Sequence, residues 1–241
     1  MQSIGWWLDQ SEQVKRKGMA MAAVAAMSLG VAGVHAEPAV HAPLAPSATH
    51  IAPLAVDFHG ETASPEARAA ARAAFEGFDA KGRPFAVVDK KEAKLFVFNA
   101  DGQLVGAASA LLGLARGDTV APGVGQMVNT GIPPALRTTP SGRYDSQPGP
   151  NLKGETVIWV DYDAAFAIHR LRPSPAYERR AERLASPSPD DNRISLGCVV
   201  VAGEFFDRVV APVLGRGPGV VYVLPEPGSA AVAQNTATGR L

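Results

Sequence analysis

Short runs in which every second residue is apolar most constrain how this chain can fold. Three of them follow one another at residues 85–89, 93–98 and 104–109, and Asp101-Gly102 separates the last two. Alternation with β-branched and aromatic residues is typical of strands, and a short Asp-Gly turn favours an antiparallel pair. The same criteria predict three further strands, at 156–161, 164–169 and 219–224. We therefore expect a mostly β domain with a few short helices.

Helical signals are fewer. Ser64-Pro65-Glu66 offers an N-cap, a proline at the first helical position and an early acidic residue, which predicts a helix within residues 64–83. Apolar spacing and charge predict two more helices, at 176–184 and 203–214. Residues 111–150 contain many glycines and prolines, so loops are expected to dominate there.

The first 36 residues are predicted to be a secretory signal. Lys15-Arg16-Lys17 is followed by the uncharged stretch 18–33 and by Val34-His35-Ala36, a small-residue cleavage site. The apolar stretch is shorter than the roughly 20 residues of a membrane span. Cleavage after Ala36 and retention as an N-terminal anchor both remain open. In either case the rest of the chain is expected to be exported. If the signal is cleaved, no membrane span is expected to remain.

The remaining chain divides by composition. Residues 37–63 are rich in Ala, Pro and His and are predicted to be a linker, whereas 84–226 form the main domain and 227–241 a disordered tail. The formal net charge is zero, with 23 basic and 23 acidic residues. Since no run of Lys or Arg follows the signal, nucleic acid is not expected to be a partner.

Cys198 is the only cysteine of the chain. A lone thiol in an exported protein is an accident, half of an intermolecular disulfide, or a reactive group. Thiolate chemistry needs a base, and His169 is the only histidine inside the predicted domain. Gly197 permits a tight turn beside the cysteine and a close approach of substrate, and Ser195 is placed to hydrogen-bond this loop. These residues predict nucleophilic cysteine catalysis.

No cofactor or metal is expected. The other four histidines all precede residue 60, and their spacings do not match a metal site. The sequence contains no glycine-rich phosphate loop after a strand and no cluster of Cys and His.

His169 followed by Ser195-Leu196-Gly197-Cys198 resembles the active-site signature of the L,D-transpeptidase catalytic domain (the YkuD family), which is a His, a spacer and Ser-His-Gly-Cys. Thr139-Pro140-Ser141-Gly142-Arg143-Tyr144 is similar to the Thr-Pro-x-Gly-x-aromatic run of that family, and the strands within 87–98 are similar to its opening hairpin. The long spacer between His and Cys resembles the proteobacterial branch. The resemblance covers residues 84–226.

This resemblance implies a β-sandwich-like, periplasmic enzyme of cell-wall synthesis. Its cysteine would attack the amide after meso-diaminopimelate in a peptidoglycan stem peptide, release D-Ala, and pass the acyl group to an amine. By matching positions, Cys198 would be the nucleophile and His169 the proton acceptor and donor. The Gly197 and Cys198 backbone would form the oxyanion site with support from Ser195. Arg193 and Tyr144 are candidate substrate contacts.

Two positions depart from the family pattern. Leu196 stands where the signature has its second histidine, and Val200 where a polar residue usually follows the cysteine. Both changes remove polar groups near the thiol but keep the nucleophile and the base. Two alternatives therefore stay open, a wall-binding domain without turnover and a cysteine-dependent peptidoglycan hydrolase whose thioester passes to water.

Overall fold

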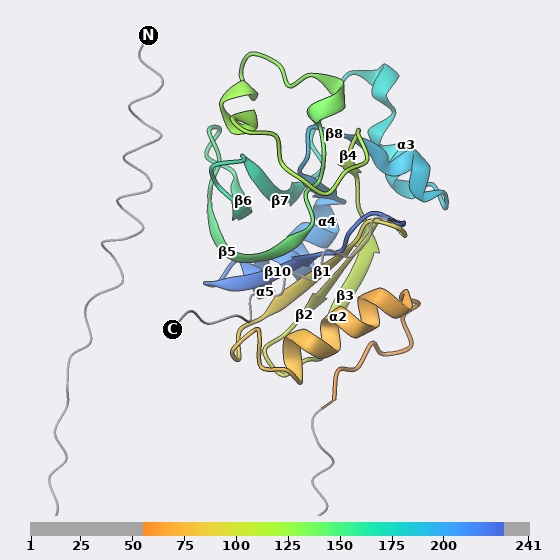
Figure 1. Cartoon of the computed structure of the whole chain (residues 1–241), viewed down its shortest axis with the longest axis vertical. Coiled ribbons are helices and arrows are strands. Elements are labelled where there is room, and N and C mark those ends of the chain that lie inside the picture. The colour runs from red at the N-terminus through yellow and green to blue at the C-terminus, as the bar shows by residue number, and fades with distance from the viewer. Residues whose placement is uncertain (1–54, 229–241) are drawn as a thin grey trace, which may run out of the picture. The chain divides into compact units, whose positions relative to one another are not determined.

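The computed structural model describes residues 55–228 (Figure 1). The predicted signal, most of the predicted linker and nearly all of the predicted tail lie outside these residues. The linker prediction extends too far at its C-terminal end. Phe58 is buried, and the backbone of Asp57 exchanges hydrogen bonds with Gly102 and Leu104, so this stretch belongs to the domain.

Eight strands form one mixed sheet. In their order across the sheet they are β3 (Leu104–Ser109), β2 (Lys94–Phe98), β1 (Phe85–Asp89), β10 (Gly219–Val223), β5 (Gly142–Pro150), β6 (Thr156–Asp161), β7 (Phe166–Arg170) and β9 (Val199–Val201). The pairs β1–β10 and β7–β9 are parallel, and the others are antiparallel. The prediction of a mostly β fold with few short helices is confirmed.

The two edges of the sheet approach each other, so the sheet nearly closes into a barrel. Leu111, just beyond β3, exchanges two backbone hydrogen bonds of 2.7 and 2.9 Å with Val200 of β9. Next to this contact, β4 (Leu112–Gly113) pairs in parallel with β8 (Arg193–Ser195). The cysteine loop, residues 196–198, joins β8 to β9 and therefore lies at this closure.

Both faces of the sheet are buried at β1, β2 and β10. One face packs against a continuous helical segment formed by α4 (Gly203–Phe205), the π-helical η5 (Phe206–Val210) and α5 (Ala211–Leu214). The other face packs against α2 (Pro65–Phe75), which Figure 1 shows lying along β1–β3. Burial on both faces explains why strands such as Phe85–Asp89 are apolar at nearly every position.

The helix α2 begins where the sequence predicts. Ser64 accepts a hydrogen bond from the backbone N–H of Ala67 and donates one to Asp89, so the N-cap also ties the helix to the end of β1. The helix ends at Phe75, earlier than the predicted range of 64–83, and it packs on the sheet through Ala67, Ala71 and Ala74. It is thus part of the domain rather than an element that precedes it.

The remaining helices are short and lie in connections. They are η1 (Val124–Met127), η2 (Pro134–Leu136), η3 (Ala176–Glu178), α3 (Arg180–Ala185) and η4 (Pro189–Asn192). The expectation of mainly loops at 111–150 was wrong for β5, which pairs with β10 on one side and β6 on the other. None of the helices among the described residues is long and apolar enough to span a membrane.

Candidate functional site

The pairing of the parallel strands β7 and β9 positions His169 relative to Cys198. Ile168 pairs with Val199 and His169 with Val200. Side chains alternate between the faces of a strand. Ile168 and Val199 face the main core, whereas Cys198 and Val200 belong to a second apolar cluster on the opposite face. Cys198 lies just before β9, two positions before Val200, which is the register partner of His169.

The His169 ring is oriented by the backbone. Its Nδ1 lies 2.8 Å from the carbonyl oxygen of Arg170. A carbonyl only accepts hydrogen bonds, so Nδ1 carries the proton and the lone pair of the neutral ring is on Nε2. Burial lowers the pKa of His169 from 6.5 to about 4, which the hydrogen bond to Arg170 opposes. The ring is therefore neutral at pH 7 and has a free acceptor nitrogen.

The thiol of Cys198 is also neutral in this structure. Burial raises the pKa of Cys198, while a hydrogen bond from the Ala167 backbone and the charge of Arg172 act in the opposite direction. Sγ donates to the carbonyl oxygen of Ala165 at 3.4 Å, not to the imidazole. Ala165 has a φ of +52°, a left-handed conformation that costs about 1–2 kcal/mol in a non-glycine residue. The turn before β7 thus aims this carbonyl at the sulfur.

The burial of His169 predicts a pH dependence of stability. Its pKa is lower in the folded chain than in the unfolded one, so below pH 6.5 the unfolded chain binds a proton that the folded chain does not. The free energy of unfolding should fall by at most about 3 kcal/mol between pH 6.5 and pH 4, with no further loss from this residue at lower pH. Urea unfolding across this range should show a smaller decrease for His169→Gln than for the wild type. Equal decreases would contradict the assignment.

The cysteine loop is fixed by Ser195 and Thr139. Ser195 Oγ accepts a hydrogen bond from Gly197 N–H at 3.1 Å and donates one to the Cys198 carbonyl at 2.6 Å. Thr139 Oγ1 donates to the Gly197 carbonyl at 2.8 Å. Gly197 has a φ of +137°, and a Cβ there would lie 2.8 Å from the Thr138 carbonyl oxygen, so only glycine fits.

These contacts modify the predicted oxyanion site. The N–H of Gly197 is engaged by Ser195, so it is not free to bind a developing oxyanion. The backbone N–H of Cys198 remains the candidate donor from this loop. The supporting position predicted for Ser195 agrees with its contacts, because its hydroxyl holds both ends of the turn around Gly197.

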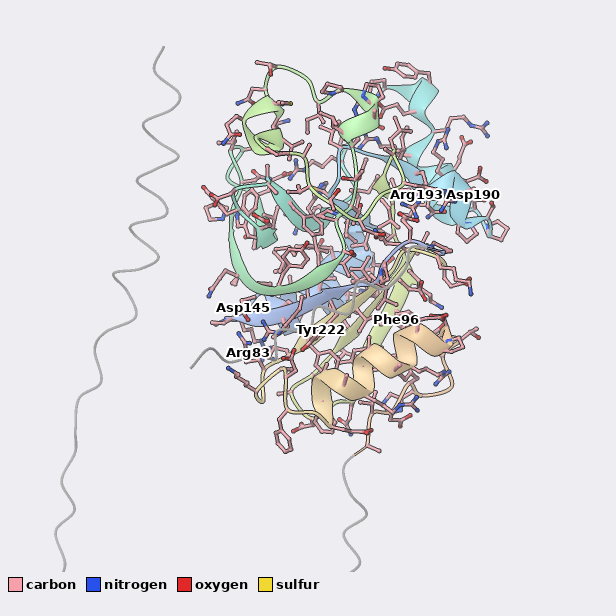
Figure 2. The ribbon with its side chains drawn as sticks, viewed as in Figure 1. Arg83, Phe96, Asp145, Asp190, Arg193 and Tyr222 are labelled. Atoms are coloured by element: carbon pink, nitrogen blue, oxygen red, sulfur yellow. The ribbon has the colours of Figure 1, made fainter. Side chains whose placement is uncertain are left out.

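Of the other two predicted site residues, Arg193 is buried and Tyr144 is half-buried. Arg193 is buried and makes a two-pronged ion pair with Glu226, at 2.8 and 2.9 Å. Figure 2 labels it next to Asp190. Tyr144 packs edge-on against Phe166 and donates from its hydroxyl to the Ser141 carbonyl. Arg193 is thus held by Glu226 rather than free to bind a substrate, and the substrate contact predicted for Tyr144 stays a prediction.

The segment between β4 and β5, residues 114–141, covers the thiol, and we call it the cover segment. A cavity of about 70 Å³ lies beside Cys198, which forms part of its wall. Five aliphatic side chains of the cover segment also line it: Val120, Val124, Val128, Ile132 and Leu136. Leu196 and Phe166 line the same cavity. Cys198 itself is half-buried beneath these side chains.

Sequence reasoning missed Thr139 as a support of the cysteine loop and Ala165 as the acceptor of the thiol. The Thr-Pro-Ser-Gly run that begins at Thr139 was a sequence signal that could have identified Thr139. The position of Ala165 depends on a turn that has no sequence signature. Between residues 55 and 228, no group of three or more His, Cys, Asp and Glu residues is placed to hold a metal ion. Comparison of the sequence with protein-family models and with curated proteins finds no match.

Proposed function

We propose that this protein is an exported cysteine acyl transferase that acts on peptidoglycan stem peptides in the periplasm, an L,D-transpeptidase of the YkuD type. The observation that carries the proposal is the pairing of β7 with β9. It places His169 of β7, the only histidine of the predicted domain, beside the strand that directly follows Cys198, the only cysteine of the chain. The backbone of Arg170 supports it further, because it holds the imidazole as the tautomer that accepts a proton on Nε2.

The proposed reaction begins with transfer of the thiol proton to Nε2 of His169. The sulfur then attacks the carbonyl carbon of meso-diaminopimelate in its amide bond to D-Ala, and the N–H of Cys198 donates to the developing oxyanion. As the tetrahedral intermediate collapses, Nε2–H returns the proton to the departing D-Ala amine. An acceptor amine attacks the thioester, loses a proton to His169, and releases the thiol. Atoms and charge balance, and no cofactor takes part.

Generation of the thiolate requires a change at the site. The thiol proton points to the Ala165 carbonyl, burial raises the pKa of Cys198, and the cover segment lines the cavity beside the sulfur. Catalytic hydrogen bonds often tighten only once substrate is bound. In this proposal, the stem peptide displaces the cover segment and the thiol turns from Ala165 toward the imidazole. Leu196 and Val200 offer no polar contact, so stem-peptide recognition falls to other residues.

Mass spectrometry with a synthetic stem tetrapeptide tests the proposal. We expect a covalent adduct on Cys198 that has lost D-Ala, and with an added diamino acid we expect a new amide product. His169→Gln should reduce formation of the adduct by about 10²–10⁴-fold, the usual contribution of a general base. Tetrapeptide binding without an adduct would instead identify a wall-binding domain. Release of the free tripeptide in the presence of the amine would identify a hydrolase.

A further inference from the structure

Lys90 is a buried charged residue to which the proposed mechanism assigns no role. It follows β1 and has no exposed surface, although lysines are almost never fully buried unless they are paired. Its Nζ donates to the Gly117 carbonyl at 2.8 Å, the Asp118 carboxylate at 2.7 Å and the Thr139 carbonyl at 2.9 Å. An ammonium group has three donors and no acceptor, so these contacts use all of its N–H groups.

The three acceptors come from the two ends of the cover segment. Gly117 and Asp118 lie just after its start, and Thr139 lies just before its end. The ends are also joined directly, since the N–H of Ser141 donates to the Asp118 carbonyl at 3.0 Å. Lys90 therefore closes the base of the segment that covers the thiol.

A second set of contacts runs from Lys90 to the cysteine loop. The Thr139 carbonyl accepts from Lys90, and the hydroxyl of the same residue donates to the Gly197 carbonyl at 2.8 Å. That hydroxyl also accepts from the N–H of Gly113 in β4 at 2.8 Å. Gly197 directly precedes Cys198, so one buried threonine lies between the ammonium group and the loop that carries the sulfur.

The position of Lys90 is itself fixed. Arg193 donates to the Lys90 carbonyl at 2.9 Å, and Glu226 lies 3.5 Å from its Nζ while it also pairs with Arg193. The exposed fraction of the Glu226 and Arg193 side chains is 7% in each case. Buried charges that satisfy one another in this way restrict movement more than a surface ion pair does.

We propose that Lys90 is a positioning residue for the loop that carries Cys198. By holding both ends of the cover segment and, through Thr139, the Gly197 carbonyl, it sets the position of Cys198 and of the segment that lines the cavity beside it. The inference rests on the proposed function only in that Cys198 is taken as the nucleophile. An apolar residue of similar length in place of Lys90 would leave these oxygen acceptors without a donor.

The rate of Cys198 alkylation by iodoacetamide, measured at pH 8, tests this role in the full chain. We expect Lys90→Met to raise the rate about tenfold, the size of effect typical for coupled neighbours. The adjacent Lys91 is exposed, so Lys91→Met is the matched control and should leave the rate unchanged. Hydrogen exchange should increase in peptides covering 114–141 and 193–199 but not in peptides covering 156–163.

Two further variants test the connection through Thr139. Thr139→Val removes the hydroxyl and should also raise the alkylation rate, whereas Thr139→Ser keeps the hydroxyl and should behave like the wild type. The double variant Lys90→Met/Thr139→Val should show less than the product of the two single effects, because both residues act on the same loop.

Several outcomes would overturn the proposal. These are an unchanged alkylation rate in a folded Lys90→Met variant, the same increase in Lys91→Met, or a uniform rise in hydrogen exchange across the domain. If Lys90→Met does not fold, equal rates for Thr139→Val and Thr139→Ser would overturn it. Alkylation needs no stem peptide. A protein that shows the expected labelling but forms no acyl adduct would therefore contradict the proposed function and not the role of Lys90.

Discussion

Replacement of Cys198 by serine should reduce D-Ala release and acyl transfer by at least about 10³-fold, because a serine hydroxyl does not supply the thiolate. The fold should survive the change. A hydroxyl is smaller than a thiol and can still donate to the Ala165 carbonyl, which is the contact that the thiol makes. Product analysis measures the activity, and thermal unfolding measures the fold.

Cys198→Ala is the matched control for this prediction. It removes the donor to Ala165 as well as the nucleophile, so it should be equally inactive and slightly less stable than Cys198→Ser. A serine variant that kept more than a tenth of the wild-type turnover would contradict the proposed mechanism. Loss of activity together with loss of the folded state would show only that the residue is needed for stability.

Glu226→Gln should lower the free energy of unfolding by about 3–5 kcal/mol, the usual cost of removing one partner of a buried ion pair. Glu226 is almost fully buried and accepts hydrogen bonds from Arg193 at 2.8 and 2.9 Å and from Arg116 at 3.2 Å. An amide in its place would turn an N–H₂ group toward a guanidinium, donor against donor, and would leave Arg193 buried without a carboxylate. Urea unfolding measures the change.

An exposed pair provides the control for Glu226. Glu204 and Arg208 are 2.9 Å apart on one face of the helical segment, with 70% and 78% of their side chains exposed. Glu204→Gln should change the free energy of unfolding by less than about 0.5 kcal/mol, because solvent screens such pairs. If Glu226→Gln cost as little as Glu204→Gln, the buried network would not stabilise the fold.

The sequence alone determined the local elements. Strands β1, β2, β3, β6 and β10 are found close to the predicted ranges, because apolar alternation and turn chemistry act within a few residues. The start of α2 follows from Ser64 and Pro65, whose side chains cap and begin the helix locally. Cys198 and His169 were selected because the chain has one cysteine and the predicted domain one histidine, and their catalytic roles remain predictions.

The tertiary structure decided what depends on distant partners. The strand β5, with its glycines and prolines, exists because β10 and β6 pair with it on either side, and sequence propensity alone does not predict it. Arg193 was expected to face substrate, but Glu226, 33 positions further along the chain, neutralises it in the interior. Nothing in the sequence distinguishes Lys90 from the other lysines. Its burial and its three oxygen acceptors in the cover segment are seen only in the folded structure. The burial of these charged side chains depends on contacts between residues far apart in the sequence. No local sequence pattern shows which residues form those contacts.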